Sequence, residues 1–261
     1  MTHNEPATGV MLVGVYGSVA LCTMIGAIAR RLGKTDDTGM VSTLEEFSHL
    51  SLPEPSQWVW GGWDIRNTSL IASARELHEV TGSISSQLFE SVSGELEKIE
   101  KNVFRGSGYG LRELLSRFDD IELTDRNAAQ SVLQMKEDIV AFRRMNSLDR
   151  VIVVNVASTE PLFEQTDAHR SLSSLDEAIS SDSEGITPSI LYAYAALDSG
   201  CPYINFTLLR ERKFQLFARL SDQKGLPHTG RERQDGRDAL KTVLRFDVRQ
   251  AELQGDGVAG L

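Results

Sequence analysis

Two runs of apolar residues constrain the fold of this chain more than any other feature. Residues 9–15 read GVMLVGV and residues 151–156 read VIVVNV, with almost no polar side chain in either run. A strand that is apolar at nearly every position has both faces buried, which is typical of the inner strands of a parallel sheet. The two runs therefore predict an α/β protein built on a parallel sheet.

The other segments have the pattern of helices and short strands. Apolar residues recur at helical spacing in four stretches, namely 18–32, 69–80, 83–99 and a long helix that Thr124 is expected to cap. A shorter apolar strand, Trp58–Trp60, is expected to be closed by two glycines, and residues 102–110 read as a loop. Strands that alternate with helices again favour the α/β class.

A polar segment divides the chain in two. Residues 167–185 are rich in Ser, Asp and Glu and read as a solvated connection. We therefore expect one domain over residues 1–166 and a second over residues 167–261.

Charge and composition argue against several classes of protein. The 261 residues carry a formal net charge of -10, so nucleic acid or an anionic membrane is not expected as the main partner. No apolar run approaches the roughly 20 residues of a membrane span. The two cysteines make no disulfide framework, and the five histidines lack the spacing of metal ligands. We expect a cytoplasmic protein without a metal site.

The first candidate site is the glycine turn after the first apolar run. It joins a strand to a helix, where backbone amides can receive a pyrophosphate. The turn departs from the usual G-x-G-x-x-G pattern because Tyr16 replaces the second glycine, and a structural turn without a ligand fits equally well. The expected cofactor contacts are Gly14, Tyr16, Gly17, Ser18 and Val19.

A second candidate follows the short strand, where two glycines precede Asp64 and Ile65. Glycines allow close approach of a ligand, and the carboxylate can accept from ribose hydroxyls. The alternative is that Asp64 caps the next turn. Asp36 and Asp37 lie nearer the usual spacing of a ribose-binding acid, but KTDDTG has the composition of a solvated turn.

A third candidate ends the second apolar run, where Ala157, Ser158 and Thr159 follow the strand. Ligands of open α/β sheets bind at that edge, although an ordinary exit from a strand is equally consistent with the residues. A fourth stretch, Thr187–Thr207, reads as a capped helix aimed into a short strand, with polar groups at the joint.

Together these pieces resemble the myo-inositol-1-phosphate synthase family. That family carries a glycine turn followed by Ser or Thr, then GG-x-DI, then a strand that ends in A-N/S-T-E, and later PS-LYA-AAL-x-G-x-P-Y/F-I/V-N. The matching residues here are Gly14, Gly17 and Ser18; Gly61, Gly62, Asp64 and Ile65; Ala157–Glu160; and PSILYAYAALDSGCPYINFT over 188–207. The resemblance covers residues 10–243 and is closest to the shorter bacterial branch.

The resemblance implies a Rossmann-like NAD-binding sheet over 1–166 with an inserted α+β substrate and oligomerisation domain, here 167–261. It implies that glucose 6-phosphate is oxidised by hydride transfer to NAD, enolised, closed by an aldol step and reduced again. It implies a homo-oligomer, usually a tetramer. It also assigns Lys241 and Asp198 as catalytic, and Asn205, Thr207 and Arg210 as substrate-binding residues.

The chain departs from the family pattern near its end. Leu208-Leu209-Arg210 replaces the usual start of the phosphate loop, and Gln234 stands where the family has a catalytic lysine. Arg231, Arg233 and Arg237 keep positive charge nearby, yet arginine does not exchange protons as lysine does, and a solvated turn fits them equally. The family's C-terminal return segment is expected to be absent.

Three functions therefore fit the sequence. The first is a cyclase of glucose 6-phosphate or of a related sugar phosphate such as fructose 6-phosphate. The second is a non-catalytic nucleotide-binding homologue, which Gln234 favours. The third is an ordinary dehydrogenase, which would release NADH, whereas a cyclase returns the hydride to its product.

Overall fold

The computed structural model describes residues 6–50, 52–161, 166–207 and 211–229, with only the backbone course at 211–215. Within these ranges six strands form one parallel sheet in the order β3-β2-β1-β4-β5-β6. The strands are β1 (Thr8–Val13), β2 (Val59–Asp64), β3 (Val103–Arg105), β4 (Arg150–Asn155), β5 (Tyr203–Asn205) and β6 (His228–Thr229). The predicted α/β class is confirmed, and the strand order is that of the Rossmann fold.

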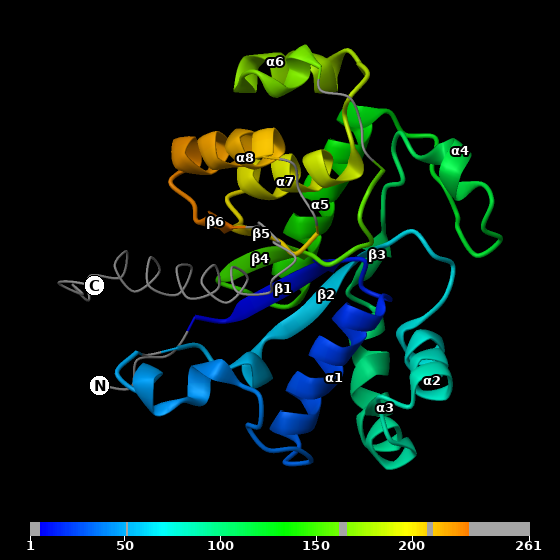
Figure 1. Cartoon of the computed structure of the whole chain (residues 1–261), viewed down its shortest axis with the longest axis vertical. Coiled ribbons are helices and arrows are strands. Elements are labelled where there is room, and N and C mark those ends of the chain that lie inside the picture. The colour runs from blue at the N-terminus through cyan, green and yellow to red at the C-terminus, as the bar shows by residue number, and fades with distance from the viewer. Residues whose placement is uncertain (1–5, 51, 162–165, 208–210, 230–261) are drawn as a thin grey trace.

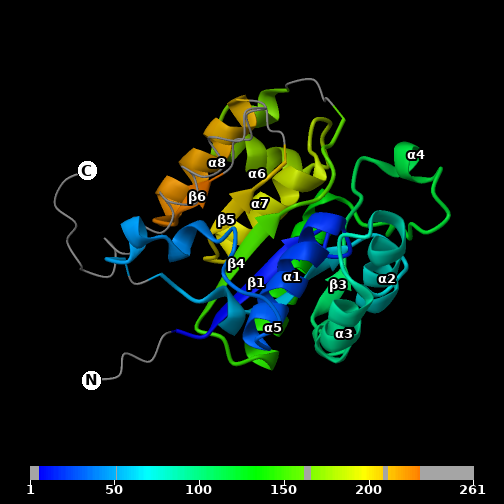
Figure 2. The ribbon, with the colours of Figure 1, turned by 60° about the horizontal axis from the view of Figure 1, so that its bottom comes forward.

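Helices cover both faces of the sheet (Figures 1 and 2). They are α1 (Ser18–Arg31), α2 (Leu70–Thr81), α3 (Ser86–Glu100), α4 (Arg112–Leu115), α5 (Ala128–Met145), α6 (Leu172–Ser180), α7 (Pro188–Asp198) and α8 (Glu211–Lys224), with short 3-10 turns at Val41–Thr43, Glu45–Phe47, Pro55–Gln57 and Asp167–His169. One buried cluster joins the sheet to α1, α2 and α3, and the other joins it to α5, α6, α7 and α8. None of the helices in the described ranges has the length and apolar character needed to cross a membrane.

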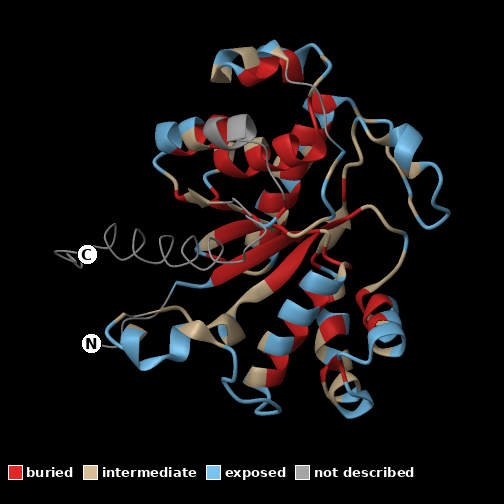
Figure 3. Ribbon diagram, in the orientation of Figure 1, coloured by how far each residue is buried: buried red, intermediate tan, exposed pale blue. Residues whose placement is uncertain are grey.

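The first apolar run forms the middle of this three-layer arrangement. β1 is buried at every position (Figure 3). Val10 and Leu12 pack with the α1 layer, whereas Met11 and Val13 pack with the α5 and α7 layer. Burial on both faces is therefore confirmed for this strand, and alternating side chains explain it.

The two glycines at 61 and 62 lie inside β2 and do not close it, so the predicted end of that strand was wrong. A Cβ atom at Gly62 would lie 2.0 Å from the Leu12 carbonyl oxygen, and one at Gly61 would lie 2.7 Å from the Asn102 carbonyl oxygen. The glycines let β2 run close to its neighbours on both sides. β3 pairs with β2 beside these glycines, within residues 102–110, which the sequence predicted to be a loop.

Two other boundaries differ from the prediction. The long helix starts at Ala128, because Asn127 and Gln130 form a capping box three residues after Thr124. The polar segment 167–185 contains α6, which buries Leu175, Ala178 and Ile179 despite its many serines. Three apolar residues on one face are enough to dock a short helix.

The sheet continues beyond the expected domain boundary at residue 166. β5 pairs with β4 through Val153–Asn155, and β6 pairs with β5. Residues on both sides of residue 166 thus belong to one sheet. The assignment of cofactor binding to residues 1–166 and of substrate binding to residues 167–261 stays a prediction.

Candidate functional site

The carboxyl ends of four strands bring the predicted segments to one edge of the sheet. The turn 14–18 follows β1, Asp64 ends β2, the loop 156–160 follows β4, and Asn205 ends β5. β1 and β4 are neighbours, and the chain adds strands in opposite directions from them (Figure 1). This edge is therefore the switch point of the sheet, where open α/β proteins bind ligands.

The glycine turn is held by the neighbouring strand. The backbone N–H groups of Gly14 and Val15 donate to the Trp63 carbonyl oxygen over 2.8 and 3.1 Å, and the Gly17 N–H donates to the Gly14 carbonyl oxygen over 2.9 Å. Gly14 has a φ of 84°, a conformation that favours glycine. The conformation of the turn is thus fixed by the protein's own backbone hydrogen bonds.

Tyr16 explains why the second glycine of the usual pattern is dispensable here. Its side chain is buried among the residues of the α1 layer, and its hydroxyl donates to Glu100 Oε1 over 2.7 Å. Burial first, and then the bond to Glu100, raises the pKa of this phenol well above its ordinary value. A side chain turned inward leaves the outer surface of the turn open without a glycine.

The N-terminus of α1 fits an anion. Its N-cap is Gly17, and no side chain caps the helix. Ser18 and Val19 at the first helical positions are exposed, Val19 by 59%. Backbone N–H groups at the positive end of a helix are a suitable site for phosphate groups.

Asp64 is buried and serves the turn. Its Oδ2 accepts from the Tyr16 N–H over 2.9 Å, and its Oδ1 accepts from the Arg66 N–H over 3.0 Å. The Arg66 Nε lies 3.6 Å from Oδ1, and Ile65 beside it is half-buried. Asp64 therefore caps its own turn, as one alternative had it, at the end of β2 where this fold usually places a ribose-binding acid.

Asp36 and Asp37 do not reach this edge. The Asp37 carboxylate pairs with Arg30 over 2.5 Å, and Asp36 accepts from the Thr38 N–H over 2.9 Å. Both aspartates are exposed in the segment after α1, as expected for a solvated turn.

The loop after β4 meets the glycine turn directly. A Cβ atom at Gly14 would lie 2.9 Å from the Ala157 Cα. The Ala157 N–H donates to Asn155 Oδ1 over 3.1 Å, while Ser158 and Thr159 are exposed. Asn155 was not among the predicted site residues, although an amide inside an otherwise apolar strand is a usable signal.

Asn205 and Thr207 are buried and bonded to each other. Asn205 Oδ1 accepts from Thr207 Oγ1 over 3.0 Å and from Asn155 Nδ2 over 2.9 Å. Asn205 Nδ2 donates to the Thr207 carbonyl oxygen over 2.6 Å. These side chains fix the ends of β4 and β5 relative to each other.

Asp198 is not brought to this edge. It ends α7, before β5 begins, so it lies toward the opposite edge of the sheet. Its carboxylate pairs with Lys136 and, over 2.5 Å, with Lys224. Burial alone would raise the pKa of Asp198, but the two lysines outweigh it and hold the pKa below its ordinary value. Within the described ranges Asp198 belongs to an ion-pair network between helices.

The remaining predicted residues lie outside the described ranges. These are Lys241, Arg210, Gln234, Arg231, Arg233 and Arg237. Over the part of the chain that is described, no group of three or more His, Cys, Asp or Glu residues could hold a metal ion.

Known proteins match this chain over most of its length. The model of an NAD-binding family described as myo-inositol-1-phosphate synthase matches residues 8–237. Inositol-3-phosphate synthase 1 of Bacteroides thetaiotaomicron is 28% identical over 96% of this chain and 61% of its own length. Inositol-3-phosphate synthase of Saccharomyces cerevisiae is 26% identical over 93% of this chain and 46% of its own length. The chain thus spans about half the length of these relatives.

A solved structure has the same fold. The crystal structure of inositol-3-phosphate synthase from Caenorhabditis elegans aligns with 88% of this chain and 50% of its own chain, with a TM-score of 0.74 and 18% identity. At this level of identity the likeness concerns the fold alone.

Proposed function

Because the chain belongs to the myo-inositol-1-phosphate synthase family, we propose that it forms the NAD-holding part of an enzyme that cyclises glucose 6-phosphate to an inositol phosphate. The family match supports NAD as the cofactor. Activity and substrate are carried over from relatives that are longer than this chain.

One observation carries the proposal. A helix N-terminus without a side-chain cap stands directly behind a turn held at φ 84° at Gly14, at the switch point of the sheet. The pyrophosphate of NAD fits the backbone N–H groups at the start of α1. Asp64 and Ala157 contact the turn, and Ser18, Val19, Ile65, Ser158 and Thr159 are proposed as further cofactor contacts. When bound, NAD would take a hydride from the sugar phosphate and return it.

The protein's own residues then have two tasks. Gly14, Gly17 and the α1 N-terminus bind and orient the cofactor, while Asp64 holds the turn through the Tyr16 N–H. Asn205 and Thr207 shape the substrate end of β5. Lys241 and Arg210 are proposed to supply the positive charge that a phosphate and a developing enolate need.

Assembly and location are part of the same proposal. We expect a homo-oligomer, a tetramer by resemblance, in the cytoplasm. Residues 1–166 would hold mainly the cofactor and 167–261 mainly the substrate.

The test has two stages. Calorimetric titration of the chain with NAD should show binding with a stoichiometry of about one. Phosphorus NMR of the chain with NAD and glucose 6-phosphate, then fructose 6-phosphate, should show an inositol phosphate signal without net NADH. Unchanged substrate with tight NAD binding would leave a nucleotide-binding homologue, and accumulating NADH would indicate a dehydrogenase.

A further inference from the structure

The loop that carries Ser158 and Thr159 is tied to a distant helix by its next residue. Both carboxylate oxygens of Glu160 accept hydrogen bonds from Ser189, one from the backbone N–H over 2.6 Å and one from Oγ over 2.7 Å. Ser189 is the second residue of α7 and is only 3% exposed. A buried N–H at a helix start needs such a partner, because water cannot reach it.

The start of α7 lacks a cap of its own. Thr187 stands at the N-cap, but its side chain makes no capping bond and its hydroxyl instead lies 3.1 Å from Ser189 Oγ. Pro188 has no N–H to satisfy. The cap is therefore supplied from the loop after β4, and a carboxylate at the positive end of a helix is electrostatically favourable.

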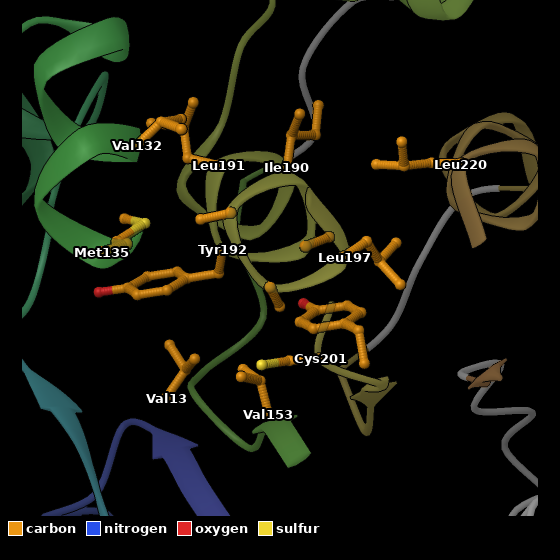
Figure 4. Close-up of a cluster of buried hydrophobic side chains, with 14 of the residues drawn as sticks. Val13, Val132, Met135, Val153, Ile190, Leu191, Tyr192, Leu197, Cys201 and Leu220 are labelled. Carbon is orange, nitrogen blue, oxygen red and sulfur yellow. The ribbon is translucent and has the colours of Figure 1, made fainter. Parts of the chain in front are cut away.

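α7 is a firm support for such a tie. Figure 4 shows its side chains packed on several sides by residues of β1, α5, β4 and α8. Ile190, Leu191 and Leu197 are fully buried. The position of α7 is thus set by the core and not by the loop.

The loop is held at both ends and open between them. At one end Ala157 lies against Gly14 and donates to Asn155 Oδ1. At the other end Glu160 is bonded to Ser189. The exposed Ser158 and Thr159 lie between these two anchored residues.

We propose that Glu160 is a positioning residue that fixes Ser158 and Thr159 for NAD by capping α7, without touching the cofactor itself. The proposal rests on the proposed function, because it assumes that NAD binds at this edge. The Glu160–Ser189 hydrogen bonds also link the loop after β4 to α7, the helix that leads into β5 and Asn205.

The test compares NAD affinities by calorimetry at a temperature well below unfolding. Glu160→Ala should weaken NAD binding tenfold or more. Glu160→Gln should stay within about threefold, because its amide can accept from the Ser189 N–H and donate to Ser189 Oγ. Ser189→Ala keeps the hydrogen bond from the Ser189 N–H to Glu160, so its NAD affinity should lie between those of the two Glu160 variants. If Glu160→Ala does not fold, the NAD affinity of Ser189→Ala tests the proposal instead.

Ser171→Ala is the matched control. It removes the N-cap of α6, where Ser171 Oγ accepts from the Ser174 N–H over 3.1 Å, at a comparable cost in stability. Its NAD affinity should stay within twofold of wild type. Hydrogen exchange at residues 186–192 should rise in Glu160→Ala with or without NAD.

The outcomes separate the two proposals. Wild-type affinity in Glu160→Ala, or equal weakening in Ser171→Ala, would overturn the positioning role while NAD binding by the wild type upholds the proposed function. A wild-type chain that does not bind NAD would overturn the proposed function and this role with it.

Discussion

Ala157 lies so close to Gly14 that a Cβ atom at position 14 would come within 2.9 Å of the Ala157 Cα. The two residues follow the neighbouring strands β1 and β4, at the switch point of the sheet. The close approach joins the glycine turn and the β4 loop into one surface. It also makes position 14 the most sensitive test of the proposed cofactor site.

Gly14→Ala is expected to lower both stability and NAD affinity. A side chain at φ 84° costs roughly 1–2 kcal/mol, and the contact with Ala157 adds to this. Relief of the contact must displace the turn or the loop, so NAD should bind at least tenfold more weakly. Urea denaturation and calorimetric titration measure the two effects.

Gly26→Ala is the control on the helix that follows the turn. Gly26 lies within α1 and is exposed, and apart from its chain neighbours and the backbone of its own helix, no described atom comes within 4 Å of the place that a Cβ would take there. Alanine there should raise stability by about 0.5–1 kcal/mol and leave NAD affinity unchanged. Equal affinities of NAD for Gly14→Ala and Gly26→Ala would contradict the site.

Tyr16→Phe is expected to affect stability without affecting NAD. The variant loses the hydrogen bond from the phenol to the Glu100 carboxylate, which should destabilise the fold by about 1.5–3 kcal/mol. The Tyr16 N–H, which donates to Asp64, is retained. NAD affinity should therefore stay within twofold by calorimetry, and a larger loss would show that the phenol itself faces the cofactor.

The sequence is most informative where one local rule decides the structure. The apolar run at 9–15 can only be buried on both faces, and Thr187-Pro188 with Gly200 marks the ends of α7. The glycine turn is also visible, because its residues are contiguous. These features depend on neighbours in the chain.

Features that depend on distant residues escape prediction. Gly61 and Gly62 suggest a strand end because glycine is common in turns. Nothing in the sequence shows that Leu12 and Asn102 lie in close contact with them. Glu160 reads as part of a motif, and its bond to Ser189 appears only when β4 and α7 are placed together. The resemblance assigns Asp198 to the site, and only the fold puts it at the far end of α7.

The amide pair of Asn155 and Asn205 is expected to be strongly coupled. Asn205→Ala leaves Asn155 Nδ2 and Thr207 Oγ1 without their buried acceptor, which should destabilise the fold by about 1–3 kcal/mol. Asn155→Ala should destabilise the fold by a similar amount. A double variant should lose less than the sum, by about 0.5–3 kcal/mol, in urea denaturation. Strict additivity would show that the pair does not act as a unit.

Asp198→Asn is expected to lower stability in a pH-dependent way and to spare NAD binding. Lys136 and Lys224 hold the pKa of Asp198 below its ordinary value of 3.8, so the carboxylate stabilises the fold above that pH, and the effect is lost as pH falls through the folded pKa. At pH 7 the variant should lose about 1 kcal/mol in urea denaturation, and the difference from wild type should shrink below about pH 4. Lys224→Ala should reproduce part of the loss at pH 7. NAD affinity should stay within twofold, because Asp198 lies toward the opposite edge of the sheet. A loss of NAD affinity larger than twofold, measured where the variant and the wild type are both fully folded, would return Asp198 to the functional site.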